Sequence, residues 1–224
     1  MEFRARPTMI GQWVRYGARG IFALLLVFEG IGLLGAFRYP IAFTWIGLFT
    51  TLVVVWGFLE LSEFFLLATY GYRYPAIVWP IAVVGVMVDA LGDILRLYVQ
   101  WSWYDQVAHL IGSTLATLVL GLWSDRAQWY GRASPHAPRM LSVVTLGITA
   151  GVLYELEEYA EDVLFHTNRL GDGPDTANDL LMNVMGAVLA VAVLRYQWHR
   201  RARAVPAIEA PPSATAVRPV VSQG

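Results

Sequence analysis

The sequence predicts an all-α membrane protein, a bundle of about six transmembrane helices. Of its 224 residues, 57% are hydrophobic, and the mean hydropathy is +0.50. The apolar residues form runs of roughly 18–28 residues, and a helix needs about 20 to cross the hydrocarbon of a bilayer. Because lipid offers no hydrogen-bond partners to the backbone, runs of this length are expected to be helices rather than barrel strands.

The predicted spans follow one another with short connections, which favours antiparallel neighbours in one bundle. In chain order they cover Gly20–Phe37, Ile41–Ala68, Ala76–Tyr98, Tyr104–Trp123, Met140–Phe165 and Thr176–Trp198. The chain thus divides into a basic segment (residues 1–19), the bundle (20–198) and a tail (199–224). The end of the tail is rich in Pro, Ala and Ser, and its apolar residues follow neither helical nor strand spacing. We therefore expect it to be disordered.

The arginines predict how the bundle is oriented. All 16 basic residues are arginine, and with six spans the side that holds both termini carries most of them. The other side carries only Arg38, Arg96 and Arg169. The positive-inside rule therefore predicts cytoplasmic termini. A net charge of −1 gives no indication of nucleic-acid binding, and the lack of cysteine excludes disulfides and thiolate metal sites.

Polar residues interrupt four of the predicted spans at helical spacing. The pairs are Asp89/Asp93, Asp105/His109, Glu155/Glu158 and Asp175/Asp179, with Asp162 extending the third pair and Asn183 the fourth. Each set lies on one helix face, and the predicted topology places all of them in the outer leaflet. A charge at membrane depth costs about 2.5–3.5 kcal/mol. We therefore expect these groups to meet one another, water or a cation.

Carboxylates with an imidazole are ligands for divalent cations such as Mg²⁺, Mn²⁺ or Zn²⁺. The candidate metal ligands are Asp105, His109, Asp175 and Asp179. In a metal-assisted hydrolysis or transfer, Glu155 or Glu158 would act as base for a bound water. Without a metal, clustered carboxyls would hold protons, which suits a proton- or cation-coupled transporter. The spacing does not choose between these interpretations.

A third interpretation is a structural polar core without chemistry. Asp105/His109 would then be an interfacial ion pair, and Asp175 and Asp179 would complement a helix N-terminus. The remaining pairs, Glu155/Glu158 and Asp89/Asp93, would bind Arg96 or polar neighbours.

Other acidic residues fall outside these stripes. Glu29, Glu60 and Glu63 form either a second polar path or bundle contacts, and Glu157 and Glu161 are expected on another helix face.

Part of the chain resembles known membrane families. The stretches WYDQVAHLIGS, YELEEYAEDVLF and DTANDLLMNVMGA resemble the D-x-x-x-H, E-x-x-E and D-x-x-x-D-x-x-x-N-x-x-G-A helices of VanZ-like proteins. Their order is also similar to that of YjdF-like proteins, bacterial inner-membrane proteins of unassigned function. The resemblance covers roughly Trp103 to Ala190 and marks Asp105, His109, Glu155, Glu158, Asp175, Asp179, Asn183 and Gly186.

The resemblance implies a place in the cell rather than a reaction. VanZ-like proteins are linked to glycopeptide resistance, which implies action near cell-wall or surface lipids. We therefore expect a multi-pass protein of the bacterial inner membrane that contacts membrane lipids and acts on a lipid-linked or envelope substrate. The sequence does not indicate the substrate or the oligomeric state.

Overall fold

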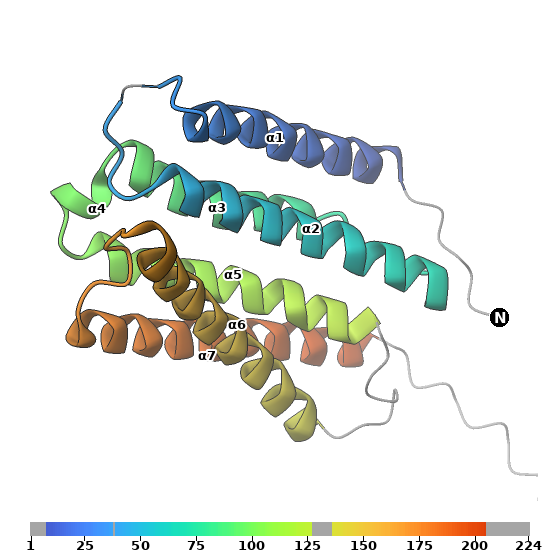
Figure 1. Cartoon of the computed structure of the whole chain (residues 1–224). Helices are drawn as coiled ribbons and strands as arrows, with labels where there is room; N and C mark the ends of the chain where they lie inside the picture. Colours follow the sequence, from blue (N-terminus) through green and yellow to red (C-terminus); the bar gives the residue numbers. More distant parts are fainter. Residues whose placement is uncertain (1–7, 38, 127–135, 205–224) are drawn as a thin grey trace, which may run out of the picture.

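The computed structural model describes residues 8–37, 39–126 and 136–204, and the regular elements in these ranges are all helices. They are α1 (Met9–Leu33), α2 (Trp45–Tyr70), α3 (Val78–Ile94), α4 (Leu97–Gln100), α5 (Tyr104–Arg126), α6 (His136–Phe165) and α7 (Gly173–Ala204). Figure 1 shows the long helices side by side, with α6 crossing at an angle and α4 as a short segment at one end. The predicted all-α fold is confirmed.

The two ends of the bundle carry different segments. Residues 34–37 and 39–44, residues 95–103 and residues 166–172 lie at one end, termed the loop end, on the left of Figure 1. The start of α1, the α2–α3 connection and the end of α7 lie at the opposite, terminal end. The described chain therefore begins and ends on the same side, as an even number of crossings requires.

Five helices are long and apolar enough to cross a membrane. They contain the stretches Met9–Leu33, Trp45–Tyr70, Tyr104–Asp125, Pro138–Phe165 and Gly173–Arg200. The sixth, α3, has 17 residues, which is near the lower limit for a span, and Figure 1 shows it running between the two ends. Large apolar side chains such as Leu61, Phe64 and Leu153 are exposed on the outside. Such a surface suits lipid, so this is a multi-pass membrane protein.

The first helix begins at Met9 rather than at Gly20. The Thr8 hydroxyl caps it by accepting a hydrogen bond from the Gly11 N–H (3.2 Å), which satisfies one of the free donors of the first turn. Part of the predicted basic segment is therefore helical. Residues 1–7 lie outside the described part of the chain.

The predicted span Ala76–Tyr98 is wrong at its outer end. The helix stops at Ile94, Arg96 adopts a left-handed φ of 58°, and α4 follows. The chain folds back so that the Tyr98 hydroxyl donates to Asp89 Oδ1 (3.0 Å). The half-buried Asp89 carboxylate thereby gains a donor, which apolar periodicity does not reveal. At the other end of the chain, α7 continues to Ala204, and the predicted tail from residue 205 onward lies outside the described ranges.

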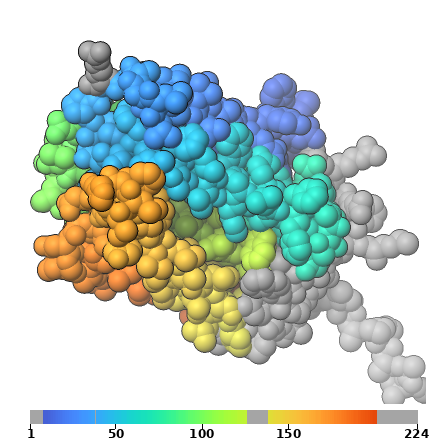
Figure 2. Space-filling model, viewed as in Figure 1, coloured from blue at the N-terminus to red at the C-terminus, as the bar shows by residue number. Residues whose placement is uncertain are grey.

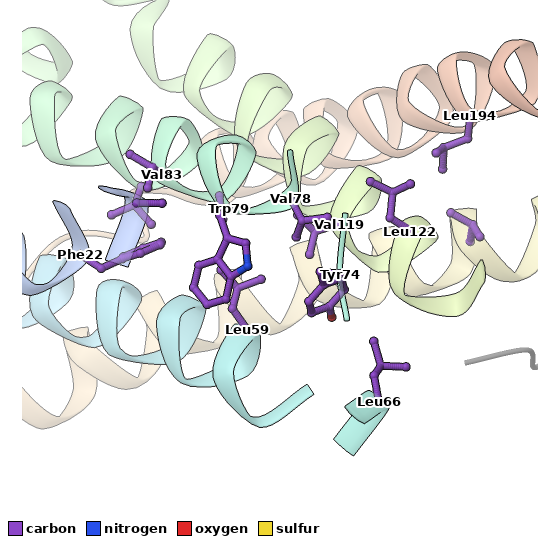
Figure 3. Close-up of a cluster of buried hydrophobic side chains, with 14 of the residues drawn as sticks. Phe22, Leu59, Leu66, Tyr74, Val78, Trp79, Val83, Val119, Leu122 and Leu194 are labelled. Atoms are coloured by element: carbon purple, nitrogen blue, oxygen red, sulfur yellow. The ribbon is translucent and has the colours of Figure 1, made fainter. Parts of the chain in front are cut away.

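The apolar core lies mainly in the terminal half of the bundle, and Figure 3 shows its side chains packed between the helices. It includes Phe22, Leu59, Leu66, Tyr74, Val78, Trp79, Val83, Val119, Leu122 and Leu194. α5 packs most extensively against α7, and α6 is held mainly by α5 and α7. Figure 2 accordingly shows a recess between α2 and α6 with α5 at its floor. The other half of the bundle, toward the loop end, holds most of the buried polar residues.

Candidate functional site

His109 is the centre of the first polar cluster. It lies in the second turn of α5 and is only 7% exposed. Its Nδ1 lies 3.3 Å from Glu155 Oε1 of α6, and its Nε2 lies 3.5 Å from Asp105 Oδ1. Asp179 of α7 approaches the same Nε2, with Oδ1 at 3.9 Å. Three helices therefore converge on one imidazole, and these four residues are termed the His109 cluster.

Close packing of α5 and α7 supports this cluster. The Asn183 side chain donates from Nδ2 to Glu155 Oε1 (3.3 Å), and the Ser113 hydroxyl donates to the Asn183 carbonyl (2.7 Å). Gly186 lets the backbones approach, because a Cβ there would lie 2.7 Å from the Leu110 carbonyl oxygen. The small residue at this crossing thus brings Asp179 of α7 close to the polar residues of α5.

The charges in the His109 cluster are not balanced by the imidazole alone. Three carboxyl groups surround one ring, and two of their buried oxygens, Glu155 Oε2 and Asp179 Oδ1, have no hydrogen-bond partner in the described chain. Buried carboxyl groups of this kind require an ion-pair partner, a cation or protonation. Two sets, Asp105/His109/Asp179 and His109/Glu155/Glu158, offer ligand atoms within 4.8 Å of one another.

The fourth predicted metal ligand, Asp175, lies nearer the surface. It is half-buried in the first turn of α7 and is not part of either close set. It borders an open depression of about 510 Å³ on the loop end, lined by Asn168, Gly171, Asp172, Pro174, Asp175 and Asn178. Asp175 lies one helical turn outward from Asp179, between this depression and the buried cluster.

Arg169, in the α6–α7 loop, is the centre of a second cluster, made of Asp89, Tyr154, Glu158, Glu161 and Arg169. Its Nε donates to Glu158 Oε1 (3.0 Å), and its Nη2 donates to the Tyr154 hydroxyl (2.5 Å). Asp89 Oδ2 lies 3.7 Å from Nη2 and Glu161 Oε2 lies 3.8 Å from Nη1. Together these residues are termed the Arg169 cluster.

The guanidinium is enclosed by protein. Gly47 of α2 leaves space for it, because a Cβ at that position would overlap with the Arg169 side chain. Burial by itself would lower the pKa of Arg169, but Tyr154, Asp89 and Glu158 raise it well above its ordinary value. The guanidinium stays charged and balances part of the acidic group around it.

The structure divides the predicted polar set in two. Asp105, His109, Glu155, Asp179 and Asn183 come together around the imidazole. Glu158 links the two clusters, because it shares a possible ligand set with His109 while it is ion-paired to Arg169. Arg169, not Arg96, is the arginine that Glu158 and Asp89 approach. One member of each pair expected to bind Arg96 or polar neighbours therefore uses a different arginine, while Glu155 and Asp93 have other partners.

Two predicted residues have local structural roles instead. Asp162 accepts hydrogen bonds from the Arg169 N–H (2.7 Å) and the Leu170 N–H (3.0 Å), so it shapes the α6–α7 loop. Asp93 accepts the Phe43 N–H (2.5 Å) and ties the segment before α2 to α3. Both were expected in the polar cluster, yet a hydrogen bond to loop backbone satisfies each of them.

Sequence reasoning missed three members of the Arg169 cluster. Glu161 was expected on another face, although its i+3 spacing from Glu158 was a signal for the same face. Arg169 was visible as one of three arginines on the outer side. Tyr154 had no distinguishing signal, and its ring lies 5.7 Å from the His109 ring.

The remaining acidic residues have different environments. Glu60 pairs with Arg19 (2.6 Å) and Glu63 with Arg15, so both make contacts between α2 and α1. Glu29 of α1 is 0% exposed, and neither of its carboxyl oxygens has a hydrogen-bond partner among the residues that the structure describes.

Neither the curated proteins nor the solved structures contain a significant match to this chain. A family model does match residues 16–201, which is most of the chain. The chain belongs to the family described as "Predicted membrane protein (DUF2238)".

Proposed function

We propose that this membrane protein binds a divalent cation, Zn²⁺, Mn²⁺ or Mg²⁺, in the His109 cluster. The observation that carries the proposal is the buried, partnerless oxygens of Glu155 and Asp179 beside one imidazole. A cation between these groups would offset their mutual repulsion and satisfy the free oxygens. Imidazole with carboxylates is a donor set that suits these metals.

The reaction class that fits such a site is metal-assisted hydrolysis or transfer. A bound divalent ion polarises a carbonyl or phosphoryl oxygen and activates a water. Of the two candidate bases, Glu155 has one oxygen without a partner, whereas Glu158 is tied to Arg169. Glu155 is therefore the better candidate to accept a proton from a bound water.

A lipid-linked or other envelope substrate fits the position of the site. The His109 cluster lies at the loop end, which the arginine distribution assigns to the outside of a bacterial inner membrane. The depression beside Asp175 opens at the same end. The resemblance to VanZ-like and YjdF-like proteins supports the same neighbourhood. The polar head of such a substrate would lie at the depression of the loop end, and its lipid chain would lie in the bilayer against the apolar outer surface.

The test is elemental analysis of detergent-purified protein. Wild type is compared with His109→Ala and Asp179→Asn, after incubation with Zn²⁺, Mn²⁺ or Mg²⁺ and removal of free ion. We expect about one equivalent of metal in wild type and a loss in both variants, because each removes a ligand.

The matched control is Glu60→Gln, which removes a carboxylate from the Arg19 pair at the terminal half and should keep the metal. Monodispersity in gel filtration shows that each variant is folded. Equal metal content in wild type and the folded His109→Ala protein would contradict the proposal.

The rival function is a proton- or cation-coupled carrier, and the buried Glu29 favours it. A carrier needs polar groups along the path, but Glu60 and Glu63 are occupied by Arg19 and Arg15. Reconstituted protein distinguishes the two functions. A metal enzyme loses activity on chelation, whereas a carrier tolerates chelation and depends on the proton gradient. If the polar core is only structural, each carboxylate variant loses stability and no metal binds.

A further inference from the structure

The two nitrogens of the His109 ring have different surroundings. Nδ1 faces Glu155 at 3.3 Å, and Glu155 is itself held by Asn183 in the α6–α7 contact. Nε2 faces Asp105 and Asp179 at 3.5 and 3.9 Å. The side chain of Asp105 is 24% exposed and that of Glu155 only 6%. One side of the ring is thus enclosed, and the other opens toward the loop end.

The two sides also differ in charge. On the Nδ1 side, Glu158 is paired with Arg169 (3.0 Å), and Glu155 Oε1 already accepts a hydrogen bond from Asn183. On the Nε2 side, His109 is the only cationic group that forms an ion pair with Asp105 or Asp179 in the described parts of the chain. Asp179 Oδ1 on this side and Glu155 Oε2 on the other have no hydrogen-bond partner in the described chain. Because Arg169 pairs with Glu158 on the Nδ1 side, the Nε2 side is the one with less positive charge.

A neutral imidazole carries one N–H and one lone pair, and the partner of one nitrogen sets the role of the other. Histidines that bind metals usually donate the second N–H to a carboxylate, which fixes the tautomer and the ring orientation. We propose that Glu155 accepts the Nδ1–H of His109, so that Nε2 binds the cation together with Asp105 and Asp179. This inference rests on the proposed cation site and changes the role of Glu155 from base to positioning residue.

The assignment has a consequence for access. The coordination positions of the cation that no protein group fills would face Asp105 and Asp175. They would open toward the depression lined by Asn168 and Asp172. A substrate head group would reach the ion from the outer surface. The buried side, with Glu155 and Asn183, would hold the ring in place.

The tautomer is tested without metal, at a pH high enough to make the ring neutral, because the neighbouring carboxyl groups favour an imidazole that is protonated at both nitrogens. In protein with ¹⁵N-labelled histidine, the nitrogen that carries the proton and the one with the lone pair have distinct ¹⁵N shifts. The chain has four histidines, and the signal that disappears in His109→Ala assigns the ring. We expect a protonated Nδ1 in wild type and in Glu155→Gln, whose amide oxygen still accepts. Glu155→Leu should give a mixture of tautomers.

Zinc titration of the same proteins tests which ring nitrogen of His109 binds the cation. Loss of a carboxylate that orients a ligand weakens metal binding by about 10–100-fold. We expect this for Glu155→Leu with unchanged stoichiometry, near wild-type affinity for Glu155→Gln, and no zinc bound by Asp105→Asn/Asp179→Asn. Thermal unfolding of each variant shows whether it is folded.

The outcomes separate the inference from the proposed function. A neutral ring that carries its proton on Nε2 would overturn the inference and put the ion on the Nδ1 side. Loss of zinc binding in Glu155→Leu, with zinc binding kept in the folded double variant, would do the same. A protonated Nδ1 in a wild type that binds no metal at all would overturn the cation site and leave the pairing of Glu155 with His109 standing.

Discussion

At the scale of single residues, each cluster sets one basic side chain against three carboxyl groups. Both clusters also contain buried oxygens without a hydrogen-bond partner in the described chain, Glu161 Oε1 in one and Glu155 Oε2 and Asp179 Oδ1 in the other. They differ in the basic group, because a guanidinium is always charged, whereas an imidazole carries charge only when it is protonated. Glu158 therefore has a permanent cation as its partner, and Asp179 does not.

Replacing Arg169 by Met should destabilise the protein strongly. Removing one partner of a buried ion pair costs about 3–5 kcal/mol, because the remaining charges are left uncompensated. Unfolding by SDS titration in detergent micelles measures the loss. Arg195→Met, an exposed arginine on α7, serves as the control, and Glu158→Gln/Arg169→Met should regain part of the stability. Equal stability of Arg169→Met and Arg195→Met would contradict the role given to Arg169.

At the scale of helices, the site depends on how closely α5 and α7 approach. Asp105 and His109 come from α5, and Asp179 and Asn183 come from α7. A Cβ on Gly186 would lie 2.7 Å from the Leu110 carbonyl and 2.9 Å from the Thr114 nitrogen. Backbone atoms cannot move aside as a flexible side chain can, so the helices themselves would have to separate.

Gly186→Ala should therefore lower both stability and metal affinity. Overpacking of a close contact costs about 1–3 kcal/mol, and the shift of α7 would move Asp179 away from His109. Gly112→Ala on α5 is the matched control, because a Cβ there meets nothing within 4 Å. Zinc titration and SDS unfolding of both variants give the comparison. A Gly186→Ala protein that binds zinc like Gly112→Ala would show that the crossing distance does not control the site.

At the scale of the whole molecule, the buried groups are segregated along the bundle. The apolar core occupies the terminal half, and both polar clusters lie toward the loop end. Lipid can solvate the apolar outer surface but not these carboxylates. Both clusters are therefore largely enclosed by helices, and Asp175, one turn outward from Asp179, borders an open depression at the loop end.

The absence of cysteine makes the orientation testable with single cysteines. Asn168→Cys is at an exposed position of the loop end, and Arg73→Cys is at an exposed position of the α2–α3 connection at the terminal end. In right-side-out vesicles, an impermeant maleimide should label the first variant and not the second, because the positive-inside rule places Arg73 in the cytoplasm. Inside-out vesicles should reverse the pattern. Labelling of Arg73→Cys from outside would mean that the bundle has the opposite orientation.

The length of the apolar runs predicted where most helices lie. It did not predict the end of α3 or the start of α1, where polar contacts are made. The break after Ile94 lets Tyr98 reach Asp89, and the early start of α1 puts Arg15 and Arg19 beside Glu63 and Glu60. Both features depend on contacts between distant residues. Hydrophobic periodicity records only which face of a helix is apolar.

The sequence by itself determined the all-α membrane fold and the stripe of His109 with its acidic neighbours, because helical spacing is local and charges in apolar runs stand out. Only the tertiary structure decided how these acids are shared. Arg169, in the α6–α7 loop, pairs with Glu158 and Asp89. The close contact of α5 and α7 at Gly186 places Asp179 beside His109. Which carboxylate meets a cation depends on the distance between helices, and that distance is set by packing between segments far apart in the chain.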